Sequence, residues 1–104
     1  MRIKLTNAQL SALECRPIGE AFIGCSGDAE EEAAHALLCR TWTGPALVFD
    51  AAEADALFSA LIEHVNAEDE YAQDKGNGEE SRRFSRGASI ALGNLAGRVL
   101  RART

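Results

Sequence analysis

The sequence predicts a small, mainly α-helical domain of about four helices, with a C-terminal antiparallel helical hairpin and a minimal two-stranded β element. Apolar residues recur at helical spacing over residues 51–73 and again over residues 80–102. The glycine-rich turn at residues 75–78 separates these two segments, so they are expected to fold back on each other. In addition, three helix starts carry a capping residue followed three positions later by Glu or Gln.

The earlier elements follow from the same signals. We expect, in chain order, a strand at residues 2–5, a helix at 7–15, an irregular stretch, a helix at 29–41, a turn at Gly44-Pro45 and a strand at 46–49. The three capping pairs are Thr6 with Gln9, Asp28 with Glu31, and Asp50 with Glu53. Each pair places its acceptor side chain where the first turn of a helix has free N–H groups.

Length and composition predict a single domain spanning residues 1–104. The hydrophobic fraction of 46% is ordinary for a globular chain. The sequence contains neither a membrane-spanning run nor the apolar core of a signal peptide. Three cysteines cannot all pair within one chain, which favours a reducing compartment. A cytoplasmic location is therefore expected.

Charge is divided along the chain. All 16 acidic residues lie in the first 80 positions, and the last 24 carry six arginines. A helical hairpin would explain this division internally, because it would bring three acidic residues near three arginines: Asp74 near Arg82, Glu70 near Arg86, and Asp55 near Arg101. An outward-facing basic stripe is the alternative.

The acidic residues predict a binding surface for a basic partner. The candidate partner-binding residues are Glu30, Glu31, Glu32, Glu68, Asp69, Glu70 and Asp74. With a net charge of −5 and no recognisable catalytic motif, the favoured function is a non-enzymatic protein-binding module. We expect a small acidic inhibitor or regulator, of the phage or accessory-genome type, that engages a basic, nucleic-acid-binding protein. The competing interpretation gives these acids no binding role: Glu30 to Glu32 only mark the start of a helix, and the cluster from Glu68 to Asp74 only forms a solvated face.

One alternative function is nucleic-acid binding through the C-terminal helix. Its candidate residues are Arg82, Arg83, Arg86, Arg98 and Arg101. The net charge argues against it, since phosphate affinity requires a basic surface. Base-reading amides are also scarce beside these arginines, with only Asn94 in the same segment.

The other alternative is a small zinc or thiol protein. Cys15, Cys25, His35 and Cys39 form a set of three cysteines and one histidine, the donor types that hold tetrahedral zinc. The nine residues between the first two cysteines do not match the short spacing of structural zinc sites. The favoured interpretation therefore has no metal and no cofactor, and Cys39 as a small buried hydrophobe.

Small residues recur at every fourth position of the last helix. They are Ser81, Ser85, Ser89, Gly93 and Gly97. Such a ridge allows a neighbouring helix to approach closely. The neighbour is either another helix of the same chain or a second copy of the protein, which would make the ridge from Ser85 to Gly97 a homodimer seam.

Overall fold

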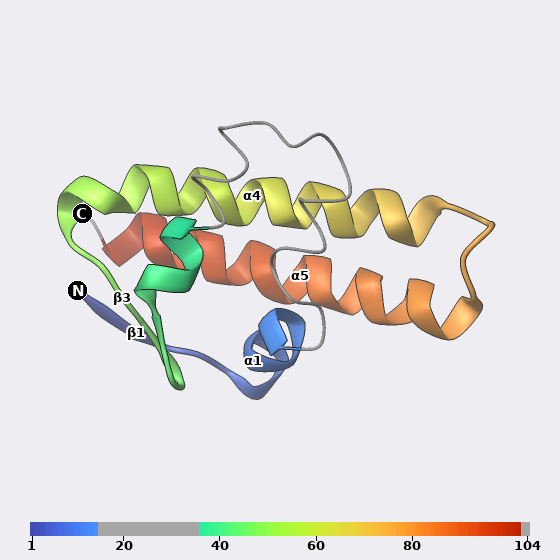
Figure 1. The fold of residues 1–104 in the computed structure, drawn as a ribbon, viewed down its shortest axis with the longest axis horizontal. Coiled ribbons are helices and arrows are strands. Elements are labelled where there is room, and N and C mark those ends of the chain that lie inside the picture. Colours follow the sequence, from blue (N-terminus) through green and yellow to red (C-terminus); the bar gives the residue numbers. More distant parts are fainter. Residues whose placement is uncertain (15–35, 103–104) are drawn as a thin grey trace.

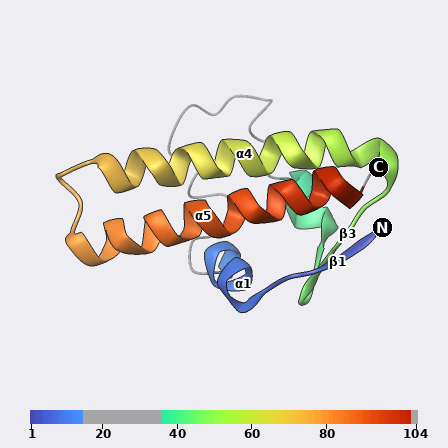
Figure 2. The same ribbon diagram turned by 180° about the vertical axis from the view of Figure 1, so that it is seen from behind.

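The computed structural model describes residues 1–14 and 36–102 of the chain. Two long helices, α4 (Ala51–Gln73) and α5 (Glu79–Ala102), form an antiparallel hairpin, with α1 (Asn7–Glu14) packed against α5 (Figure 1). A small sheet lies at the end of the hairpin opposite the α4–α5 turn (Figures 1 and 2). The mainly helical class and the C-terminal hairpin are thus confirmed.

The sheet has three antiparallel strands, in the order β1 (Arg2–Lys4), β3 (Ala46–Val48), β2 (Trp42–Thr43). The sequence predicted the pairing of the outer strand β1 with β3 and missed β2. Ile3 lies opposite Leu47 in the first pair, and both side chains are buried. β2 and β3 are joined by a tight turn in which Gly44 adopts a positive φ of 59°, a conformation that glycine tolerates without steric cost.

Both capping boxes in the described residues form as the sequence predicts. At the start of α1, Gln9 N–H donates to Thr6 Oγ1 at 3.2 Å and Thr6 N–H donates to Gln9 Oε1 at 3.0 Å. Asp50 and Glu53 exchange the equivalent bonds at the start of α4. The third predicted pair, Asp28 with Glu31, lies outside the described residues.

Glu53 also receives a charged partner. Arg40 Nη2 donates to Glu53 Oε2 at 2.8 Å. This bond, together with the bond from the Asp50 backbone, lowers the pKa of Glu53 below its ordinary value.

Arg40 precedes Thr41, the last residue of the helical segment at residues 36–41. The predicted helix at 29–41 can be compared with the structure only over that segment.

The core lies where α4, α5 and the sheet meet. Its fully buried aliphatic side chains come from all three, and they include Leu47, Leu57, Leu61, Leu92, Leu95 and Val99. Burying one such side chain contributes about 1.5–3 kcal/mol. Phe84 is large and apolar, but it is 37% exposed and lies at the edge of the α1–α5 contact.

Side chains close the turn between the two long helices. Asn77 Nδ2 donates to the Tyr71 carbonyl at 3.0 Å, and Arg82 Nε donates to the Ala72 carbonyl at 2.9 Å. The Asp74 carboxylate accepts from Gly76 N–H at 2.9 Å. The last carbonyls of a helix have no partner within the helix itself. These bonds therefore fix the end of α4 and the entry of α5.

Candidate protein-binding surfaces

The exposed face of α4 is acidic. This 23-residue helix contains no lysine or arginine. Asp55, Glu63 and Glu70 are exposed on the side that faces away from α5 and the core, and Asp74 follows at the C-cap. Glu63 and Glu70 are seven residues apart, which is two helical turns and about 10 Å along the axis. Glu63 and Glu70 therefore project from one side of the helix.

Glu68 does not belong to this surface, contrary to the sequence prediction. Its side chain is fully buried. Glu68 continues the buried stripe of α4 that runs through Leu57, Leu61, His64 and Ala72, because residues three or four apart share a helix face. The consecutive acids at positions 68–70 therefore point in different directions, and only Glu70 is exposed to solvent.

Glu68 lies beside His64 in the protein interior. His64 Nε2 is 3.6 Å from Glu68 Oε1, one helical turn away, and both side chains are fully buried. Acidic side chains are rarely fully buried unless they are paired. His64 is therefore a structural neighbour of Glu68 and has no access to solvent.

Asp69 is engaged inside the hairpin. Ser89 Oγ donates to Asp69 Oδ1 at 2.6 Å, a bond between α5 and α4. Ser89 is 8% exposed, and Ser85 on the preceding turn is fully buried. Ser85 and Ser89 of the predicted small-residue ridge thus pack against the chain itself. These two residues cannot form a homodimer seam.

The predicted acidic set is therefore reduced. Glu30, Glu31 and Glu32 lie outside the described residues. Glu68 is buried and Asp69 is bonded to Ser89. Glu70 and Asp74 stay exposed. The structure adds Glu63, which the sequence interpretation missed although its seven-residue spacing from Glu70 was a usable signal.

The C-terminal arginines are also divided between internal and external roles. Arg82 holds the α4–α5 turn through the Ala72 carbonyl, and Arg98 Nη1 donates to Gln9 Oε1 of α1 at 3.1 Å. Arg83 lies 3.6 Å from Glu79 at the solvent-exposed start of α5, and Arg86 is exposed. The five predicted arginines thus do not form one continuous outward stripe. In the described part of the chain, no ion pair links Asp74 to Arg82 or Glu70 to Arg86.

Of the zinc alternative, the described residues include only Cys39. Its side chain is exposed and not in a disulfide, so its prediction as a buried hydrophobe was wrong. Cys15, Cys25 and His35 lie outside the described residues. Within residues 1–14 and 36–102, no group of three or more His, Cys, Asp or Glu side chains could hold a metal ion.

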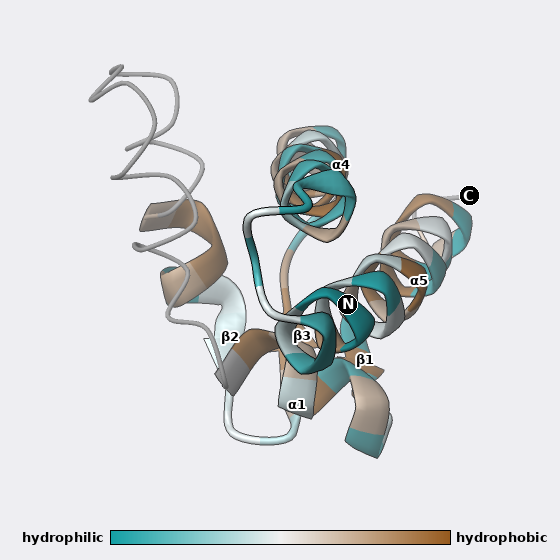
Figure 3. Ribbon diagram, turned by 90° about the vertical axis from the view of Figure 1, so that its right-hand side faces the viewer, coloured by the Kyte–Doolittle hydropathy of each residue, from teal (hydrophilic) through white to brown (hydrophobic). Residues whose placement is uncertain are grey.

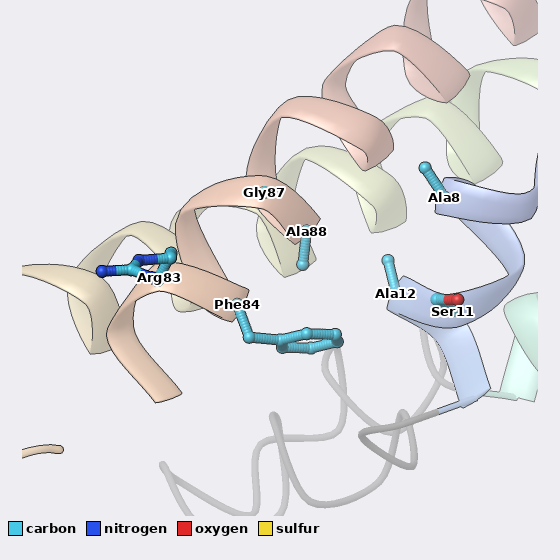
Figure 4. Close-up of a pocket in the computed structure, with 7 residues that line it drawn as sticks. All are labelled: Ala8, Ser11, Ala12, Arg83, Phe84, Gly87 and Ala88. Carbon is cyan, nitrogen blue, oxygen red and sulfur yellow. The ribbon is translucent and has the colours of Figure 1, made fainter. Parts of the chain in front are cut away.

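A shallow apolar hollow lies between α1 and the first half of α5 (Figure 4). It is lined by Ala8, Ser11, Ala12, Arg83, Phe84, Gly87 and Ala88. The Phe84 ring extends toward α1, and alanines from both helices form the rest of the wall (Figure 4). The hollow has a volume of about 220 Å³ and is open to solvent. Sites that bind small ligands usually have volumes of about 300–1,000 Å³ and bury most of the ligand surface. The hollow has neither property.

No protein-family model, curated protein or solved structure matches this chain. The described helices also include none with the length and apolar character needed to cross a bilayer. Any functional assignment therefore rests on the surfaces described above.

Proposed function

We propose that this protein is a non-enzymatic protein-binding module that uses the exposed face of α4 to engage a basic partner. The observation that carries the proposal is the set of exposed carboxylates on α4. Its solvent face presents Glu63 and Glu70 two turns apart, with Asp74 at the end, and the helix itself contains no lysine or arginine. Fields of one sign accelerate encounter with a surface of the opposite sign.

The chemistry of the partner follows from that of the face. Carboxylates at helical spacing match lysine and arginine side chains, which gather where proteins bind nucleic acid. The proposal is therefore a small acidic inhibitor or regulator that occupies the basic surface of a nucleic-acid-binding protein. The proposal also places the protein in the cytoplasm, because an odd number of cysteines fits a reducing compartment.

Direct nucleic-acid binding through α5 is the weaker alternative. Arg82 and Arg98 are used within the fold, and Arg83 already has an acidic neighbour in Glu79. Too few cations are left to neutralise several phosphates, on which the affinity of such proteins depends. Fluorescence anisotropy with a labelled oligonucleotide at low salt tests this alternative directly.

The test of the proposal is affinity capture from host lysate with matched charge reversals. Glu63→Lys and Glu70→Lys each change the acidic face, while Glu80→Lys makes the same charge change on α5. We expect the native protein and Glu80→Lys to retain a basic protein at low salt and to release it at high salt. Glu63→Lys and Glu70→Lys should lose it. Equal retention by all four proteins, or no retained basic protein, would contradict the proposal.

A further inference from the structure

The outer edge of the sheet, at β1, has no partner strand among the described residues. β1 is an edge strand, and β3 is the described strand that pairs with it. Figure 3 looks along the hairpin and shows the strands in the order β2, β3, β1 from left to right, beneath α4 and α5. An edge strand presents a row of backbone N–H and C=O groups that no neighbouring strand uses. The edge of β1 is thus open to a further strand.

The bonds to β3 determine which backbone groups of β1 point outward. Leu5 N–H donates to the Pro45 carbonyl at 2.8 Å, and the Met1 carbonyl accepts from the N–H of the residue after β3 at 2.9 Å. In an antiparallel ladder, successive residues direct their N–H and C=O groups to opposite sides of the strand. The N–H and C=O groups of Arg2 and Lys4 therefore point away from β3, toward the open edge.

This edge is basic. Arg2 and Lys4 are exposed, and both side chains project from one face of the sheet because they are two residues apart. The three strands together contain no acidic residue. Val48 lies opposite Arg2 and is 45% exposed, so the same face also offers an apolar side chain. Two cations beside outward N–H and C=O groups fit an extended chain that carries carboxylates.

We propose that the outer edge of β1 binds an acidic, extended segment of a partner protein as a further strand of the sheet. The segment runs antiparallel to β1, as β3 does to both of its neighbours. Its residues opposite Arg2 and Lys4 are Asp or Glu, and each exchanges two backbone bonds with the basic residue that it faces. The backbone groups thus select a β-strand, and the two cations select carboxylates at alternate positions.

The same cations exclude a second copy of β1 from this edge. Pairing of two β1 strands through the outward groups of Arg2 and Lys4 places one of these cations directly opposite another in every register. Like charges at directly opposite positions destabilise a sheet, and natural edge strands use lysine to prevent such association. An acidic segment replaces this repulsion with attraction. β1 lies at the opposite end of the hairpin from the α4–α5 turn (Figure 1), so this inference is independent of the proposed function of α4.

Titration of isotope-labelled protein with a short acidic peptide, followed by NMR at low salt, tests the proposal. The probe is acetyl-Glu-Val-Glu-Val-Glu-amide, and the control peptide has lysine in place of each glutamate. With the acidic peptide we expect saturable shifts of the Arg2 and Lys4 amide signals, larger than the shift of Ile3, whose amide faces β3. The lysine peptide should cause none. N-methylation of the glutamates should abolish binding and N-methylation of the valines should not, because the antiparallel pairing turns the glutamate N–H groups toward β1.

Substitutions at the edge separate this site from a general attraction to acidic peptides. Lys4→Glu should weaken binding about tenfold. Lys4→Pro removes an outward N–H but keeps the bonds to β3, and it should weaken binding as much with an unchanged circular dichroism spectrum. Lys75→Glu, at an exposed position beside the α4–α5 turn, is the matched control and should bind like the native protein. Three results would each overturn the proposal: no saturable shift at about 1 mM acidic peptide, equal binding of the peptide with N-methylated glutamates, or equal weakening by Lys75→Glu and Lys4→Glu.

Discussion

The bond between Ser89 and Asp69 gives a quantitative test of how the hairpin is packed. Replacing Ser89 with alanine removes a hydroxyl that donates to the Asp69 carboxylate at 2.6 Å. Hydrogen bonds to charged groups contribute about 1.5–3 kcal/mol. Asp69 keeps partial contact with solvent, so the lower end applies, and we expect Ser89→Ala to reduce the free energy of unfolding by about 1.5 kcal/mol. For a domain of this size that corresponds to a fall in Tm of roughly 6–12 °C.

A double-mutant cycle separates this bond from other effects of the substitution. Ser89→Ala, Asp69→Ala and the double variant are unfolded with urea and followed by circular dichroism. We expect a coupling energy of about 1 kcal/mol between the two sites. Ser59→Ala is the matched control, since Ser59 is exposed on α4, and it should change stability by less than about 0.5 kcal/mol. A coupling energy below about 0.3 kcal/mol would refute the placement of Ser89 against α4.

Three further predictions follow from the same structure. Asp50→Ala removes the N-cap of α4 and should cost about 1 kcal/mol of stability, measured by urea unfolding; an unchanged midpoint would contradict the cap. Glu68→Lys places an ammonium group in a fully buried position beside His64. In urea unfolding it should lower the free energy of unfolding by more than about 3 kcal/mol. Glu70→Lys, on the exposed side of α4, is the control and should change that free energy by less than about 0.5 kcal/mol. Folding lowers the pKa of Glu53 from its ordinary value of 4.5. The stabilising contribution of its carboxylate is therefore present above pH 4.5 and is lost as the pH falls through the lower folded pKa. Glu53→Gln should have a smaller free energy of unfolding than the native protein at neutral pH and the same value in acid, whereas a difference that does not change with pH would contradict this assignment.

The sequence predicted the helices of the hairpin closely, because they carry strong local signals. α4 spans the residues that its apolar periodicity and its capping box predict, and α5 differs from the prediction by one residue at its start. Strand β2 was missed because two residues are too few to show alternation. It forms only because β3 offers a partner edge on the other side of a tight turn.

The candidate site was harder to predict because it depends on how each helix is rotated. Three consecutive acids at positions 68–70 occupy about 200° of a helix, so they cannot share one face. The burial of Leu57 and Leu61 determines which side of α4 faces the core. Glu68 lies seven residues, or two helical turns, after Leu61, and that spacing would have predicted a buried position for Glu68. The cluster of negative charge in the sequence concealed this pattern.

The small-residue ridge does not stay on one face of α5 for a related reason. A repeat of four residues advances about 40° around a helix at each step. The row therefore starts at the exposed Ser81, passes through the core at Ser85 and Ser89, and is half-buried at Gly93 and Gly97. Ser89 is the member bonded to α4, through Asp69.

Binding of a basic protein to the acidic face of α4 is best tested by the affinity of the purified complex at low and at high salt. The captured partner would be titrated by calorimetry with the native protein, with the Glu63→Lys/Glu70→Lys double variant and with Glu80→Lys. We expect high salt to weaken the native complex by more than about tenfold. At low salt the double variant should bind at least about a hundredfold more weakly, while Glu80→Lys should bind like the native protein. A dissociation constant that is unchanged by salt and by the double substitution would contradict the proposed binding.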